Sequence, residues 1–298
     1  MIRTMLPWLQ EAGEAAGAGG LGIGEMIMHH VTDSHVIELP FYGPLELPRW
    51  APIHLGPLTI DLSPTKHVVF LLLAAVIVAT VMIWTARHTQ RRGAERAPRG
   101  FANLVELFVI FLRDEVAMAN IGHGGERYVP YVLTLFFFIL LANLLGLLPF
   151  GSTATANLSV TGALALMSLV AIEVSGLLTL GTKGYARTIF YAPQGLNPIG
   201  RALILVIMTP VEFLGKLTKP FALAIRLFAN MNAGHFVILA LIGLIFVGAP
   251  LKGFILPWLA PVIMSVAILL LELFVAFLQA YIFAMLTSVF IGLIRHAH

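Results

Sequence analysis

The sequence predicts an all-α integral membrane protein with five transmembrane helices and one interfacial amphipathic helix. The first observation behind this is composition: 59% of the 298 residues are hydrophobic and only 11% are charged. A soluble domain has about 45–50% apolar and about 25% charged residues. So few charges cannot cover a surface that faces water, which makes lipid the main solvent. The second observation is that apolar stretches long enough to cross a bilayer alternate with short polar segments.

Residues 1–66 are predicted to be an outward-facing N-terminal segment without a long helix, because six prolines between positions 40 and 64 would break one. The first 25 residues contain Glu11 and Glu14 among glycines and alanines, where a signal peptide has a continuous apolar region. We therefore expect no cleaved signal peptide, and instead a short amphipathic or disordered segment.

The first transmembrane helix is predicted at residues 67–86, which carry no full charge, and it is followed by five arginines within thirteen positions. Arginine and lysine concentrate on the cytoplasmic side, so the loop 87–129 is predicted to be cytoplasmic and the N-terminus to lie outside. Within this loop, residues 101–118 are apolar but carry four charged residues. This pattern favours an amphipathic helix in the interface over a weak transmembrane span.

A transmembrane hairpin is predicted at 130–181, with helices near 131–148 and 158–180 joined by a short, uncharged outer link. Residues 197–295 are predicted to form two longer helices, 199–247 and 256–294, of about 70 and about 55 Å. Both exceed the roughly 30 Å hydrocarbon core, so we expect a strongly tilted helix hairpin that forms an ion path. Five crossings place the C-terminus in the cytoplasm.

Arg226 is the most informative residue within these apolar stretches. The next lysine, arginine or acidic residue after it is Lys252, and a central charge in a spanning helix costs about 2.5–3.5 kcal/mol on insertion scales. A guanidinium stays protonated in proteins, so it is a permanent positive charge that cannot itself carry protons. It can pair with a carboxylate and repel a proton. The alternative is a structural ion pair within the chain.

Helical phase groups the other polar residues. His235 lies about 180° from Arg226 in a straight helix, while Glu272 and Gln279 share a face of the last helix. The simplest interpretation is a polar stripe that meets a partner's carboxylate, with His235 and Glu272 facing a hydrated cleft. The stripe on the face of Arg226 contains Glu212, Lys219, Arg226 and Asn230.

Each of these residues also has a purely structural alternative. Glu212, Lys216 and Lys219 can mark the cytoplasmic interface, and Asn230 and Gln279 can hold helices together. His235 and Glu272 can form a structural hydrogen bond between helices. Asn143 and Asn157 are expected to cap or link helices, with channel lining as the alternative. No carboxylate spacing completes a metal site with the three N-terminal histidines. These histidines are His29, His30 and His35.

Five motifs resemble subunit a of F-type ATP synthases, and the resemblance covers about residues 50–295. The most specific is KPFALAIRLFANMNAGH at 219–235, followed by LLLELFVAFLQAYIFAMLT at 269–287. NLVELFVIF at 103–111, NLLGLLPF at 143–150 and TANLSVT at 155–161 match in order. The family implies a stator beside a ring of c subunits, in which protons enter and leave through two half-channels. It also implies b-type stalk partners, membrane lipid, and a bacterial plasma (inner) membrane.

By this resemblance, Arg226 faces the ring carboxylate and prevents a proton short-circuit, and Gln279 lies near it. Asn230 and Glu212 match positions that line the ion path. His235 and Glu272 stand where many bacterial members carry a carboxylate and a histidine. This exchange implies that the two side chains are close in space and can relay a proton. Gly146 stands where several relatives have an acidic residue, which puts an outer-channel role of that position in doubt.

The chain is expected to bind no cofactor, metal, nucleotide or nucleic acid, and to be a non-catalytic component of the complex; no GxxxxGK[ST] motif occurs. Protons are the predicted ion, because a histidine titrates near neutral pH. The alternative function is a self-contained secondary transporter, whose usual internal repeats with broken helices are not visible in the sequence. A membrane scaffold without transport would not explain why Arg226 and Glu272 stand in apolar helices despite the cost of inserting them.

Overall fold

The structure is a computed structural model, and it describes most of the chain outside the N-terminal 31 residues. The expected amphipathic or disordered segment, the predicted absence of a signal peptide, His29 and His30 therefore lie outside the described residues. The described ranges are 32–39, 43–51, 53–55, 58–60, 63–92, 100–148, 151–190, 197–247 and 256–296.

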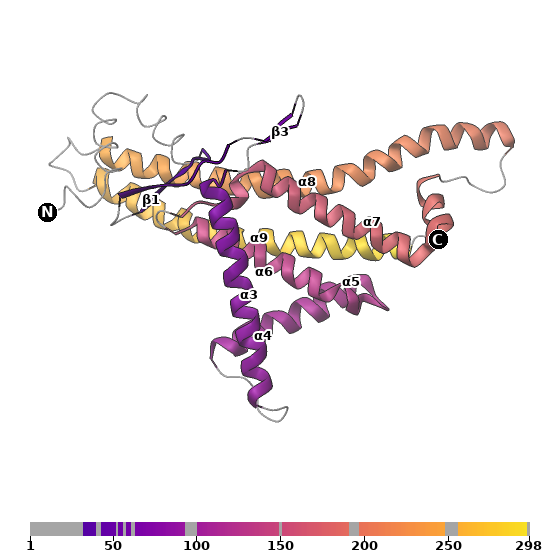
Figure 1. Cartoon of the computed structure of the whole chain (residues 1–298), viewed down its shortest axis with the longest axis horizontal. Coiled ribbons are helices and arrows are strands. Elements are labelled where there is room, and N and C mark those ends of the chain that lie inside the picture. Colours follow the sequence, from indigo (N-terminus) through magenta and orange to yellow (C-terminus); the bar gives the residue numbers. More distant parts are fainter. Residues whose placement is uncertain are drawn as a thin grey trace. The chain divides into compact units, whose positions relative to one another are not determined.

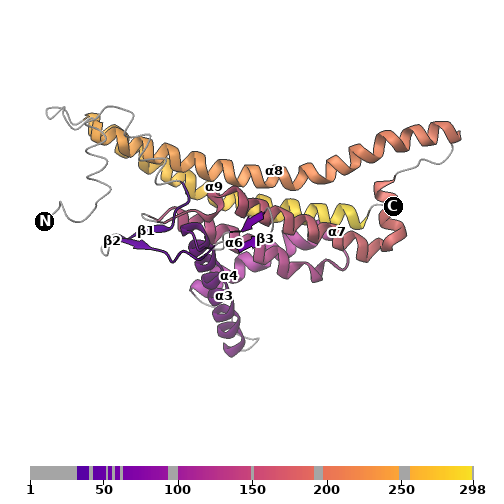
Figure 2. The same cartoon turned by 45° about the horizontal axis from the view of Figure 1, so that its top comes forward.

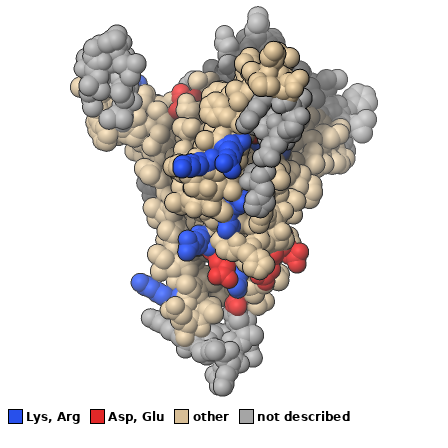
Figure 3. All heavy atoms as spheres, turned by 90° about the vertical axis from the view of Figure 1, so that its right-hand side faces the viewer, with Lys and Arg blue, Asp and Glu red and all other residues tan. Residues whose placement is uncertain are grey.

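In the described part of the chain, five helices are long and apolar enough to cross a membrane, as predicted. This confirms the fold class of an all-α membrane protein (Figure 1). Much of their surface is apolar: in Figure 3, charged side chains occupy a small part of the visible face. The five helices are α3 (Lys66–Arg92), α6 (Val129–Gly146), α7 (Leu158–Ile189), α8 (Pro198–Val247) and α9 (Leu256–Arg295).

The segment expected to lie in the interface is helical. It consists of α4 (Phe101–Phe111) followed by a π-helical stretch, Leu112–Met118, and the short α5 (Ala119–Ile121). One stripe of this segment, including Ala102 and Val105, is buried, while Leu104 and Leu107 are exposed. A 3-10 turn at Gly125–Arg127 leads into α6. Its position in the membrane interface stays a prediction.

The helix α7 departs from regular geometry at Gly181, the residue at which the sequence predicts the span to end. Gly181 has φ 68° and ψ 173°, and a second helical stretch continues to Ile189. A side chain would be strained in this conformation, which glycine adopts freely. The stretch after Gly181 carries Lys183, Tyr185 and Arg187.

The last two helices are long, as predicted, with 50 residues in α8 and 40 in α9. At 1.5 Å per residue they measure about 75 and about 60 Å. Pro210 and Pro220 lie inside α8, and Pro261 lies inside α9. Although a proline removes one helical hydrogen bond, α8 is a continuous ribbon in both views (Figures 1 and 2). The tilt of these helices in a bilayer stays a prediction.

The N-terminal segment contains two short antiparallel strand pairs that the sequence analysis did not expect. The strand β1 (Val36–Leu39) pairs with β2 (Gly43–Glu46), with Val36 opposite Glu46. The strand β3 (Ile53–Leu55) pairs with β4 (Leu58–Ile60). Hairpins of three or four residues per strand are compatible with frequent prolines, which exclude a long helix but fit edge strands and turns.

The chain divides into two compact units, each made of separate segments. Unit 1 comprises Met1–Ile77, Leu140–Asn157 and Phe228–Leu278. Unit 2 comprises Val78–Ile139, Leu158–Leu227 and Gln279–His298. The predicted site residues fall into both: His235, Glu272 and Asn230 belong to unit 1. Arg226, Gln279 and Glu212 belong to unit 2.

Candidate functional site

The central feature of unit 1 is a contact between a histidine and a glutamate from two different helices. His235 Nδ1 on α8 lies 2.9 Å from Glu272 Oε1 on α9, which confirms that the two side chains are close in space. Glu272 is only 3% exposed, and its other oxygen, Oε2, is buried and makes no hydrogen bond within the described residues. One oxygen of Glu272 is thus paired with His235, and the other can accept a further hydrogen bond.

The opposite edge of the His235 ring contacts a hydroxyl. Its Nε2 lies 3.4 Å from Thr153 Oγ1, and Thr153 is 2% exposed. The imidazole therefore stands between a hydroxyl and a carboxylate. Because one ring nitrogen donates while the other accepts in the neutral form, it can take a proton on one side and release one on the other.

A glycine makes this contact possible. A Cβ at Gly234 would lie 2.8 Å from both Cδ and Oε1 of Glu272, closer than side-chain atoms approach. Glycine at 234 therefore leaves the space in which the Glu272 carboxyl lies beside α8.

Gly146, at the end of α6, plays a similar part. A Cβ there would lie 1.7 Å from Thr153 Oγ1, so the Thr153 hydroxyl occupies the place of a side chain at position 146. This gives a physical reason for the doubt raised by the sequence: an acidic residue does not fit at 146 in this structure. A hydroxyl that contacts His235 lies there instead.

Thr153 begins a short polar segment, residues 153–157, which we call the 153–157 turn; it contains a 3-10 turn at Ala154–Ala156. Thr155 Oγ1 donates to Asn143 Oδ1 at 2.6 Å. The Asn143 amide donates in turn to the Ala276 carbonyl of α9 at 3.3 Å. Both Asn143 and Thr155 are fully buried. Asn143 thus links the turn to α9 within unit 1, at a position four residues after Glu272.

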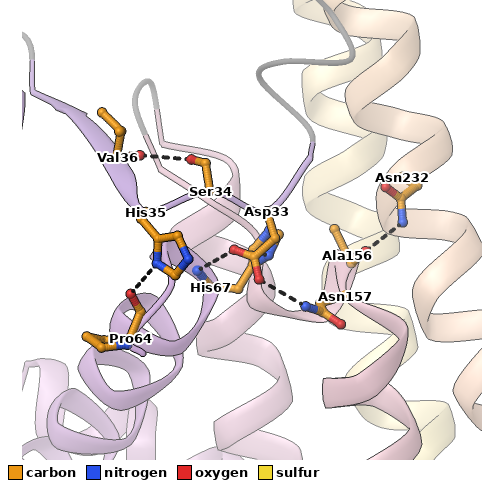
Figure 4. A network of polar contacts seen from close by, with 9 residues as sticks. All are labelled: Asp33, Ser34, His35, Val36, Pro64, His67, Ala156, Asn157 and Asn232. Carbon is orange, nitrogen blue, oxygen red and sulfur yellow. Dashed lines mark hydrogen bonds and ion pairs between the residues drawn. The ribbon is translucent and has the colours of Figure 1, made fainter. Parts of the chain in front are cut away.

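The second half of the turn has two further partners (Figure 4). The Asn232 amide on α8 donates to the Ala156 carbonyl at 3.1 Å. The Asn157 amide donates to Asp33 Oδ2 at 3.3 Å. The turn therefore contacts the N-terminal segment, α6 and α8, and its neighbour Asn143 reaches α9.

Asp33 is itself paired with the first transmembrane helix. Its Oδ1 lies 2.9 Å from His67 Nδ1, and it also accepts a 3.4 Å hydrogen bond from the His67 backbone amide. His67 is buried at the start of α3, whereas the Asp33 side chain is 27% exposed. The His35 ring has a different partner: its Nδ1 lies 3.1 Å from the Pro64 carbonyl (Figure 4).

In unit 2, Arg226 projects from α8 without a partner in the described part of the chain. Its side chain is exposed and makes no hydrogen bond or ion pair with any described residue, so the alternative of an internal ion pair finds no support there. Its neighbours Phe221 and Ile225 are exposed apolar side chains, while Leu223 and Leu227 are buried. Arg226 is therefore a single charge on an apolar, outward surface of its helix.

The other predicted residues near Arg226 do not join it. Gln279 on α9 is 6% exposed, and among the described residues no hydrogen bond links it to Arg226. Asn230 is half-buried, and its side chain makes no hydrogen bond with any described residue. Of the six predicted site residues, the structure joins only His235 and Glu272 directly.

Glu212 lines a cavity of about 130 Å³ in unit 2. Lys216 Nζ lies 3.4 Å from Glu173 Oε2 and 4.6 Å above the Tyr185 ring. The Tyr185 hydroxyl donates to the same Glu173 oxygen. The cavity thus combines charges of both signs with apolar walls. Its lining comprises Leu169, Ile172, Glu173, Thr188, Glu212, Lys216, Lys219, Pro220, Phe290, Leu293 and Ile294.

Several of these residues escaped the sequence analysis. Glu173 could have been found, because it is the only charged residue between positions 158 and 180. Like Arg226, it places a costly charge in an apolar, membrane-spanning stretch. Thr153, Asn232 and Asp33 gave no such signal. They are ordinary polar residues in segments where polar residues are common, and only their neighbours in space distinguish them.

Known proteins resemble this chain over most of its length. The family model described as ATP synthase A chain matches residues 68–292. A protein named ATP synthase subunit a from Chlorobium phaeobacteroides is 46% identical, over 94% of this chain and 78% of its own length. One of the same name from Anaeromyxobacter dehalogenans is 47% identical, over 96% and 75% respectively. With a family match over most of the sequence and relatives of this identity, the chain belongs to the ATP synthase subunit a family.

Proposed function

We propose that the chain is the stator channel subunit of a rotary F-type ATP synthase, which provides two proton half-channels to a ring of c subunits. Arg226 would face the ring carboxylate and prevent protons from passing directly between the half-channels. Membership in the family supports this proposal. The observation that carries it is a lone, exposed guanidinium on an apolar surface of a helix long enough to span a membrane.

Arg226 has no ion-pair partner among the described residues. A permanent charge facing lipid would be costly, and within the described residues nothing neutralises it. A carboxylate on another subunit would do so, and Arg226 would in turn favour the ionised form of that carboxylate. The same positive charge repels a proton. Arg226 would thus release protons from the ring and block their leakage without carrying them.

His235 and Glu272 are proposed to relay the proton on one side of this barrier. The pair has two neutral arrangements, which differ only by the transfer of a proton across the 2.9 Å between Nδ1 and Oε1. Neither arrangement buries a net charge, and the one in which both groups are neutral avoids the desolvation cost of two buried ions. The proton would arrive through the Thr153 hydroxyl, which contacts His235 Nε2. It would leave from Glu272 Oε2, which makes no hydrogen bond among the described residues.

The cavity around Glu212 and Lys216 is proposed to belong to the second half-channel. Two carboxylates and two amines around about 130 Å³ favour water over lipid in this space. The alternative, that Glu212, Lys216 and Lys219 only mark an interface, is compatible with the same contacts. A proton acceptor beside hydrated space is what a release pathway requires.

The proposed setting follows from the charge pattern and the family. The N-terminus would lie outside and the C-terminus in the cytoplasm of a bacterial plasma (inner) membrane, because arginines crowd the loop after α3. The c-ring and b-type stalk subunits would be its protein partners. Nucleotide chemistry would belong to other subunits, and this chain would have no catalytic activity of its own.

The decisive experiment replaces Arg226 in the assembled complex. We expect Arg226→Ala to abolish ATP-driven proton pumping and coupled ATP synthesis in membrane vesicles, because the ring carboxylate loses its counter-charge. Arg113→Ala is the matched control: Arg113 is also an exposed arginine of unit 2, and its one ion pair among the described residues is with its neighbour Asp114 at 3.8 Å. Coupled synthesis that survives Arg226→Ala would rule out the proposed function.

A further inference from the structure

We infer that Asp33 and His67 form a proton-collecting pair at the entrance of the path that leads to His235 and Glu272. This inference rests on the proposed function and adds two residues to it. It comes from the polar network of unit 1, in which a single short segment of the chain contacts two separate acid–histidine pairs. Figure 4 shows the pair formed by Asp33 and His67.

The pair has one accessible and one buried member, as an entrance requires. The Asp33 side chain is 27% exposed and that of His67 only 4%. A proton from water therefore meets the Asp33 carboxylate first. From there it can pass to His67 Nδ1, 2.9 Å away. This is an ion-pair distance, and the ring nitrogen has no hydrogen-bond geometry toward any described residue. The pair thus places a titratable ring beside a carboxylate at the beginning of an apolar helix of 27 residues.

The 153–157 turn joins this pair to the central one. Its last residue, Asn157, donates to Asp33 Oδ2, and its first, Thr153, contacts His235 Nε2. Four residues of chain extend over at most about 14 Å, a distance that a few water molecules in hydrogen-bonding contact can bridge. The polar groups along the turn, including the Ala156 carbonyl and Asn232, would hold such water.

Two further titratable side chains lie close to the pair. Lys66 precedes His67 in the chain and is 8% exposed, so a positive and a negative charge both stand next to the imidazole. Among the described residues, His35 hydrogen-bonds to the Pro64 carbonyl and makes no hydrogen bond with the turn.

A purely structural role of Asp33 makes a different prediction, and Asp33→Asn separates the two. Asparagine keeps the size of the side chain and one acceptor oxygen, for the His67 backbone amide. Its amide nitrogen takes the place of Oδ2 and can donate to the Asn157 side-chain oxygen once that amide is flipped. Asparagine cannot take up a proton. If Asp33 only anchors the turn, this variant retains most of the activity, whereas Asp33→Ala loses it.

The test measures proton flow through the assembled membrane sector in vesicles, with the pH on the N-terminal side varied. We expect Asp33→Asn to slow the flow about tenfold where protons are scarce on that side, the lower range for a charged entrance. The deficit should shrink as that side is made more acidic, and a high concentration of a small mobile buffer should restore the rate. Asp33→Glu should retain more flow than Asp33→Asn, and His35→Gln, the matched control, should behave as the unchanged protein.

Two results would overturn the inference. One is normal flow in Asp33→Asn at every pH. The other is an equal loss at every pH without rescue by buffer, which is the signature of a misplaced turn. Arg226→Ala measured in parallel keeps the proposals apart. If Arg226→Ala uncouples the complex while Asp33→Asn is normal, only this inference fails; if Arg226→Ala leaves coupling intact, the proposed function fails.

Discussion

The polar network of unit 1 and the charged cavity of unit 2 differ in how their polar side chains are accommodated. Unit 1 buries hydrogen-bonded groups, whereas unit 2 keeps charged groups partly exposed beside a cavity. Around the 153–157 turn, hydrogen bonds connect amides, hydroxyls, the His235–Glu272 pair and the Asp33 carboxylate, which is also ion-paired with His67. Asn143, Thr155 and Glu272 are almost completely buried. Around Lys216, carboxylates and amines surround open space, and the Glu173–Lys216 pair retains 24% and 14% exposure of its side chains.

This difference follows from the cost of burying charge. A hydrogen-bonded acid–histidine pair can hold its proton so that both groups are neutral, which spares it the desolvation cost of two ions. A lysine or glutamate that carries its charge needs either water or a close partner. Unit 1 can therefore bury its acid–histidine pair between helices, while the charged side chains of unit 2 lie beside a cavity. If both belong to one proton path, its two halves differ in construction.

The largest expected effect comes from breaking the buried pair. Glu272→Leu should reduce proton conduction through the assembled complex at least about 100-fold, because the relay loses its acid–base group. Glu272→Gln keeps the shape and an acceptor for His235, so it should assemble normally and still fail to conduct. The exposed neighbour Leu273 on α9 provides a control, Leu273→Ala. Conduction at the normal rate in Glu272→Leu would show that the pair is structural.

A smaller effect is expected from filling the space beside the carboxyl. Gly234→Ala places a Cβ 2.8 Å from Glu272 Oε1, so it should destabilise the assembled subunit by about 1–3 kcal/mol, as overpacking does. Proton conduction should also fall. Gly215→Ala in the same helix meets no atom within 4 Å and should stabilise it by up to about 1 kcal/mol.

The midpoint temperature of thermal dissociation of the purified complex measures both glycine variants. The two substitutions add the same methyl group to the same helix, so a difference in sign isolates the contact with Glu272. Equal midpoints for Gly234→Ala and Gly215→Ala would contradict the close packing between α8 and α9 in unit 1.

The smallest effect is expected in the cavity of unit 2. Lys216→Met should change stability by no more than about 1 kcal/mol, because a partly exposed ion pair contributes little. Glu173 would also keep its hydrogen bond from the Tyr185 hydroxyl. The same thermal dissociation measures this change. A loss as large as that of Gly234→Ala would mean that the cavity is dry, and the contrast between the two units would disappear.

The helices were largely predictable, and their contacts were not. Composition and spacing placed Arg226, His235 and Glu272 in apolar helices, and the resemblance implied that His235 and Glu272 meet. That these two face a hydrated cleft stays a prediction: Glu272 is buried, and Glu212 and Lys216 line a cavity in unit 2. The strand pairs near the N-terminus were not expected, because segments this short give no periodic signal.

By itself, the sequence determined the solvent and the fold class of this protein, since 11% charge and long apolar stretches leave no other stable environment. It also determined which residues carry charge inside the helices. Only the tertiary structure decided that the contact between His235 and Glu272 joins Nδ1 to Oε1 at 2.9 Å, that Thr153 fills the place beside Gly146, and that Asp33 joins Asn157. Hydropathy is a local sum over about twenty residues. A contact between side chains depends instead on the packing of helices that lie far apart along the chain.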